Sequence, residues 1–95
     1  MILTGTILSG GSLDISVKPN VVGTRRQVSA TRSFQVTAEG AGTLTFSAKM
    51  TGMTGFEAFL SLTGKTEIAD LNEAEEIRLS AAGGDVTYVV AIYTV

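Results

Sequence analysis

The chain contains no cysteine, no histidine and no tryptophan, and it has a single proline. Without cysteine it can form neither a disulfide nor a thiolate metal site. Without histidine it lacks the commonest metal ligand and the commonest general base near neutral pH. A serine nucleophile of the usual kind needs that base. We therefore expect a protein that is not an enzyme, with no catalytic residue, no metal site and no cofactor.

Charge is scarce as well. Charged residues make up 17% of the chain, below the ~25% of an average domain. The 95 residues suffice for one domain, residues 1–95, whose stability margin is thin because a short chain buries little surface. Small domains without disulfides or metals are often stabilised by self-association. This predicts a homo-oligomer.

Alternation of apolar and polar residues runs through most of the chain and predicts strands with one buried face. Turns rich in glycine separate the strands at ~8–12-residue intervals, a spacing typical of a sandwich. We expect an all-β fold, an antiparallel β-sandwich (jelly-roll-like or Ig-like) of about seven to eight short strands. The predicted core is Leu13, Ile15, Val17, Phe34, Val36, Leu44, Phe46, Leu60, Leu62, Ile77, Leu79 and Val90.

Two segments interrupt this pattern. Residues 65–76 lack clear alternation, and Asn72 with Glu75 three positions later has the form of a helix capping box. A short helical turn is expected there. The stretch around residues 19–31 is the least patterned, and it is expected to be a long connection or an arm.

The C-terminal stretch Val86–Val95 is apolar on both faces of a strand. Such a segment would template aggregation as an exposed edge, so it is expected either at the centre of a sheet or against a neighbouring subunit. The residues predicted for an oligomer interface are Tyr88, Tyr93 and Val95.

Positive charge is concentrated in residues 15–38, which contain four basic residues and no acidic one. The net charge of the whole chain is −2, which argues against nucleic acid as the partner. A basic patch on an acidic chain fits better with an acidic protein surface, such as that of a capsid protein. The predicted partner-binding residues are Lys18, Arg25, Arg26 and Arg32.

Two further motifs carry weaker signals. Gly64-Lys65-Thr66 matches the end of a phosphate-binding loop, but Phe59 occupies the position of its first glycine. Asp70, Glu73, Glu75 and Glu76 supply carboxylates without the spacing or the glycine of a calcium loop. A turn with an exposed lysine and a solvated acidic segment explain them more simply.

The N-terminus has no basic segment followed by a long apolar run, so no signal peptide is expected. The longest uncharged apolar stretch is about half the ~20 residues that a membrane helix needs. We therefore expect synthesis in a host cytoplasm and no membrane partner.

The chain resembles small bacteriophage virion proteins of the capsid cement or decoration type. The resemblance lies in its composition, in the alternation of residues 43–49 (TLTFSAK) and in the apolar C-terminal residues 88–95 (YVVAIYTV). It implies a β-sandwich or barrel that assembles as a trimer on a capsid lattice, at the virion surface. The expected function is a virion surface cement protein that stabilises such a lattice. The alternative is a carbohydrate-binding or adhesin-like sandwich.

Overall fold

The computed structural model describes residues 2–17, 31–72 and 74–94 of the chain. Within these ranges every regular element is a strand. The strands are β1 (Ile2–Ile7), β2 (Ser12–Ser16), β3 (Thr31–Glu39), β4 (Thr43–Met50), β5 (Glu57–Leu62), β6 (Thr66–Asn72), β7 (Ala74–Ala82) and β8 (Val86–Thr94). The connection or arm predicted around residues 19–31 lies almost entirely outside the described residues.

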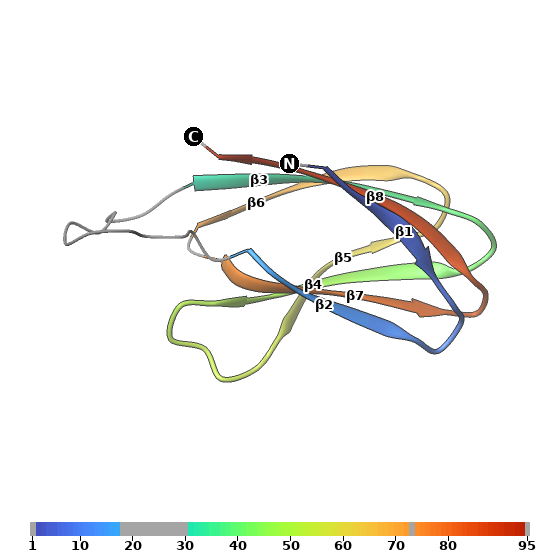
Figure 1. Cartoon of the computed structure of the whole chain (residues 1–95), viewed down its shortest axis with the longest axis horizontal. Coiled ribbons are helices and arrows are strands. Elements are labelled where there is room, and N and C mark those ends of the chain that lie inside the picture. Colours follow the sequence, from blue (N-terminus) through green and yellow to red (C-terminus); the bar gives the residue numbers. More distant parts are fainter. Residues whose placement is uncertain (1, 18–30, 73, 95) are drawn as a thin grey trace.

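The strands pair in a nested order. β1 pairs with β8, β2 with β7, β3 with β6 and β4 with β5, all antiparallel. The described chain is thus one long hairpin, with its tip between β4 and β5, that folds over into two layers (Figure 1). One sheet has the order β1-β8-β3-β6 and the other β2-β7-β4-β5. This is a jelly roll, so the predicted antiparallel β-sandwich is confirmed and its topology is defined.

The prediction of a helical turn in residues 65–76 was wrong. Thr66–Asn72 forms β6, which pairs with β3 along its whole length, and Ala74–Ala82 forms β7, so Asn72 and Glu75 both lie in strands. The alternation is hard to see in the sequence because the inward positions are occupied by Glu67, the small Ala69 and Leu71. Ile68, which is as large as the inward Leu71, points outward and is 63% exposed.

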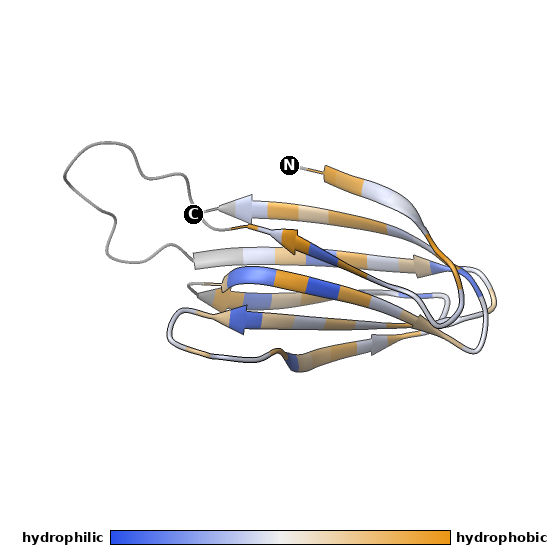
Figure 2. Cartoon of the chain, turned by 60° about the horizontal axis from the view of Figure 1, so that its bottom comes forward, coloured by the Kyte–Doolittle hydropathy of each residue, from blue (hydrophilic) through white to orange (hydrophobic). Residues whose placement is uncertain are grey.

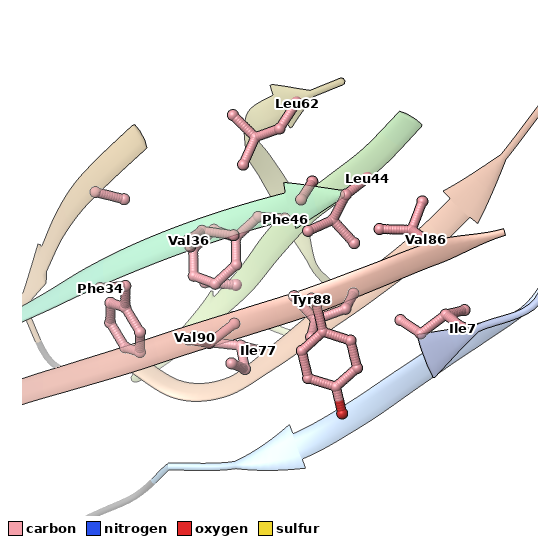
Figure 3. Close-up of a cluster of buried hydrophobic side chains, with 14 of the residues drawn as sticks. Ile7, Phe34, Val36, Leu44, Phe46, Leu62, Ile77, Val86, Tyr88 and Val90 are labelled. Carbon is pink, nitrogen blue, oxygen red and sulfur yellow. The ribbon is translucent and has the colours of Figure 1, made fainter. Parts of the chain in front are cut away.

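The core fills the space between the two sheets. The Phe34 and Phe46 rings, from β3 and β4, are fully buried, with centroids 5.5 Å apart and ring planes tilted by 51°. Tilted aromatic pairs at this separation are favourable beyond their burial alone. Aliphatic side chains from both sheets surround them, as Figure 3 shows. The largest fully buried aliphatic members of the cluster are Val36, Leu44, Leu62, Ile77, Leu79, Val86 and Val90.

Four predicted core positions are less buried than expected. Leu13 is 37% exposed, so its placement in the core was wrong, while Ile15, Val17 and Leu60 are half-buried. Leu13, Ile15 and Leu60 belong to β2 and β5, which are the edge strands of their sheet, and Val17 directly follows β2. An inward side chain at an edge has a neighbour on one side only, so solvent still reaches it.

Candidate functional site

Most of the predicted basic residues lie outside the described part of the chain. Lys18, Arg25 and Arg26 are not among the described residues. Arg32 lies in β3, where its backbone stands between Leu71 of β6 and Thr94 of β8. The acidic-partner interface remains a prediction from the sequence.

The residues that we predicted for an oligomer interface on the last strand differ in their exposure to solvent. β8 is an inner strand, paired with β1 on one side and with β3 on the other. Tyr88 turns inward and is only 6% exposed (Figure 3), whereas Tyr93 turns outward and is 55% exposed. Val95 lies outside the described residues. β8 can therefore meet a partner only through its outward face.

The outward face of the β2-β7-β4-β5 sheet carries a charged cluster. The Arg78 guanidinium of β7 binds the Asp14 carboxylate of β2 through two hydrogen bonds, of 2.7 and 3.0 Å. The same guanidinium carbon lies 4.0 Å from the ring centroid of Phe56. Beside it, Lys49 Nζ of β4 lies 2.7 Å from a carboxylate oxygen of Glu76 on β7. We call these five residues the charged face.

Hydrogen bonds within the charged face favour the ionised forms of Asp14, Lys49 and Arg78. The hydrogen bond from Arg78 holds the pKa of the Asp14 carboxyl below its usual 3.8. The same bond raises the pKa of Arg78, and the hydrogen bond to Glu76 raises the pKa of Lys49. An acid that stays ionised is a poor proton donor at neutral pH, and a lysine with a raised pKa is a poor nucleophile. The interactions of the charged face connect β2 to β7 and β4 to β7, so the cluster is suited to stabilising this sheet.

The other outward face, on the β1-β8-β3-β6 sheet, is very different. It contains two acidic residues, Glu39 and Asp70, and no base among the described residues. Threonine hydroxyls pair across its strands, Thr37 with Thr66 at 2.8 Å and Thr6 with Thr87 at 3.3 Å. We call it the low-charge face; its members are Ile2, Thr4, Thr6, Ser33, Gln35, Thr37, Glu39, Thr66, Ile68, Asp70, Thr87, Val89, Ala91 and Tyr93.

Exposed apolar side chains gather on the low-charge face. Six large hydrophobic residues are exposed in the described part of the chain, and three of them, Ile2, Ile68 and Tyr93, lie there. Ile2 and Ile68 belong to the same cross-strand row, which runs Ile2–Ala91–Gln35–Ile68. Exposed apolar side chains at both ends of this row, on a sheet face with few charges, are suited to contact with another protein. Sequence reasoning identified Tyr93 but missed Ile2 and Ile68, because only the strand pairing brings them into one row.

Within the described residues, which do not include Glu73, neither of the two weaker motifs forms a ligand site. Lys65 follows the turn at Gly64 and makes an ion pair of 2.8 Å with Glu67. Asp70 points outward from one sheet, whereas Glu75 and Glu76 belong to a strand of the other. Glu75 accepts a hydrogen bond of 3.2 Å from Thr51. Among the described residues, no group of three or more acidic side chains is placed to hold a metal ion.

No protein-family model matches the chain, and no curated protein matches it significantly. None of the described residues belongs to a helix that could span a membrane.

Proposed function

We propose that the chain is a non-enzymatic structural protein that decorates a virion surface and stabilises the capsid lattice. The low-charge face is the surface that would contact the lattice, and the residues that carry the proposal are Ile68 and Tyr93. They are 63% and 55% exposed, and they project from a sheet whose pairing holds them in place. The compositional resemblance to phage decoration proteins and the jelly-roll fold, which recurs in viral capsid proteins, both support the proposal.

The mechanism is passive. A protein that binds the assembled lattice better than free subunits shifts the equilibrium toward the assembled state by mass action. Burial of the exposed apolar side chains supplies affinity, at ~25 cal/mol per Å² of apolar surface removed from water. The basic residues of the segment 15–38, which we predict to bind the partner, would steer the chain toward an acidic lattice surface. Their charge would mainly affect the association rate and its salt dependence.

The test is binding to virions purified from the phage or host that encodes the chain. We expect the chain to band with the particles in a density gradient at a fixed ratio to the major capsid protein. Particles stripped of it should take up the purified chain again and then disassemble at a higher temperature. Absence from the particle band, or equal binding to unassembled capsid subunits, would refute the proposal.

Variants locate the surface that binds. Ile68→Lys and Tyr93→Lys each place a charge on the low-charge face, and we expect each to weaken binding to stripped particles at least tenfold. Ser61→Lys is the matched control, because Ser61 is exposed on the outward face of the other sheet. Unchanged binding of both face variants would remove this face from the interface.

A carbohydrate-binding function is the second candidate, and one row of the low-charge face favours it. The exposed Tyr93 ring stands beside Ser33, which in turn stands beside Asp70. An aromatic ring with a neighbouring hydroxyl and carboxylate offers both stacking and hydrogen bonds to a sugar. Saturable binding on a glycan array that Tyr93→Ala abolishes would establish this function in place of lattice binding.

A further inference from the structure

Among the described residues β1 is an edge strand, and half of its backbone groups have no strand partner there. It lies at the end of its sheet and pairs with β8 on one side. In an antiparallel edge strand, every second residue turns its amide and carbonyl away from the sheet. These groups form a template for another strand, and natural proteins usually protect such an edge with charge or proline.

Among the four edge strands, β1 is the one without that protection. β2 contains Asp14, β5 contains Glu57, and β6 contains Glu67 and Asp70. β1 has neither a charged residue nor a proline. In Figure 2 the ribbon of β1, which begins at N, is orange toward both ends and pale between them, without a strongly hydrophilic segment. Its ends are also apolar and exposed, at Ile2 (68%) and at Leu8 (67%), which directly follows the strand.

The sequence of this edge is self-complementary. Residues 2–8 read Ile-Leu-Thr-Gly-Thr-Ile-Leu, which is nearly the same in both directions about Gly5. An antiparallel copy centred on Gly5 places Thr4 opposite Thr6, Leu3 opposite Ile7 and Ile2 opposite Leu8. Because the numbers of each pair differ by an even amount, both partners lie on the same face of the joined sheet.

We propose that two copies of this chain associate through β1, antiparallel about a two-fold axis at Gly5, and join their sheets into one continuous sheet. The pairing satisfies the free backbone groups of both edges. It also brings the exposed Ile2 of one copy against the exposed Leu8 of the other, once on each side of the axis. The half-buried Leu3 gains Ile7 of the second copy as an inward neighbour.

This arrangement requires that no charge on the edge lack an opposite partner. Two-fold pairing places equivalent surfaces together, so a charge at the axis would face its own copy. Gly5 meets this requirement at the axis itself. Its missing side chain leaves room for the Tyr88 ring of its own subunit on the inward side, where a Cβ would lie 2.8 Å from the Tyr88 hydroxyl.

The proposed pairing is independent of the lattice function and specifies a different assembly from the trimer predicted by resemblance. An isologous contact closes with two copies. The first measurement is the molar mass of the untagged chain in solution, by sedimentation equilibrium from about 1 to 100 μM, a range that spans typical micromolar affinities. We expect a dimer, twice the 9.9 kDa of one chain. A monomer throughout, or a trimer, would overturn the proposal.

Double variants that introduce two charges into β1 test the register of the pairing. In Thr4→Lys/Thr6→Lys, each new lysine faces a lysine of the second copy, and we expect at least a tenfold weaker dimer. In Thr4→Lys/Thr6→Glu, each lysine faces a glutamate, so the dimer should persist. Circular dichroism and urea unfolding of both variants check that each still folds. Equal dimerisation of both variants would overturn the register and the proposal with it.

A matched control distinguishes the effect of charge on β1 from a general effect of added charge on dimerisation. Thr66→Lys/Ile68→Lys introduces two lysines at outward positions of β6, the opposite edge of the same sheet. We expect this variant to remain a dimer, although it should lose binding to virions. If it becomes monomeric while Thr4→Lys/Thr6→Lys remains dimeric, the copies meet at β6 and the proposal fails.

Discussion

Gly5 and Tyr88 stand directly opposite each other on β1 and β8, and the tyrosine ring occupies the space that a side chain at Gly5 would fill. The ring covers the glycine of an edge strand, an arrangement that compensates for the side chain that glycine lacks. Tyr88 is thereby buried in the core beside the edge where we propose that two copies meet.

Gly5→Ala should therefore destabilise the fold. The new Cβ would lie 2.8 Å from the Tyr88 hydroxyl oxygen, so the ring must move within a packed interior, at a cost of about 1–3 kcal/mol in the free energy of unfolding. Tyr88→Phe removes that oxygen, and we expect Gly5→Ala to cost less in its background. Urea unfolding of the four proteins at one concentration forms the double-mutant cycle. Additive effects would show that the two sites do not interact.

Gly42→Ala should be destabilising for a different reason. A Cβ at Gly42 would collide with the backbone carbonyl oxygen of Gly84, and a backbone atom cannot move away as a side chain does. We expect a loss of about 1–3 kcal/mol or more in the free energy of unfolding. Gly55→Ala is the control, because no atom lies within 4 Å of its added Cβ. Equal unfolding midpoints for the two variants would contradict the close approach of the β3–β4 turn, which contains Gly42, to the β7–β8 turn, which contains Gly84.

Phe46→Ala removes one half of the aromatic pair at the centre of the core. The ring is fully buried, and truncations of this kind cost about 3–5 kcal/mol, a large share of the ~5–15 kcal/mol that holds a typical domain together. Tyr93→Ala, at an outward ring that is 55% exposed, should change stability by less than about 0.5 kcal/mol. Thermal or urea unfolding compares the two, and a loss below about 1 kcal/mol for Phe46→Ala would contradict its burial.

The Asp14–Arg78 pair predicts part of the response to acid. Because Arg78 lowers the pKa of Asp14 in the folded chain, the carboxylate contributes stability at pH values above its unfolded pKa of about 4. That contribution disappears as the pH falls through the lower folded value. In Asp14→Asn we expect a smaller loss of stability between about pH 5 and pH 2 than in the unchanged chain. Identical pH profiles would show that the pair has no influence.

The origin of that pKa can be measured directly. Carboxyl-detected NMR should place the Asp14 pKa below 3.8, and Arg78→Gln should raise it because the charged hydrogen-bond donor is lost. High salt should reduce the shift, since the pair is open to solvent. A pKa that does not respond to Arg78→Gln would assign the shift to another cause.

The strands with strong alternation could be predicted from the sequence, and β6 could not. In β3, large apolar residues such as Phe34 and Val36 occupy the inward positions, so the period of two is evident. In β6 the outward Ile68 is larger than the inward Ala69, which hides that period. Backbone pairing with β3 makes β6 a strand, and such pairing depends on a segment distant in the sequence.

The candidate surfaces were predictable only in part. Composition alone argued against catalysis, and the apolar character of the last strand identified Tyr93. The sequence could not distinguish Tyr88 from Tyr93 as inward and outward, because both faces of β8 are apolar. Alternation likewise predicted that Ile15 of β2 points inward. It could not predict that β2 is an edge strand, which leaves Ile15 only half-buried.

By itself, the sequence determined the all-β class, the positions of most turns and the near-symmetry of residues 2–8 about Gly5. These properties are local, because side chains alternate with a period of two along any strand and glycine permits tight turns wherever it occurs. Only the tertiary structure decided that β1 is an edge, that β8 lies between β1 and β3, and that Ile2 and Ile68 share one row. Those relations follow from pairing between residues as far apart in the sequence as Ile2 and Ala91, and local alternation does not specify which strands pair.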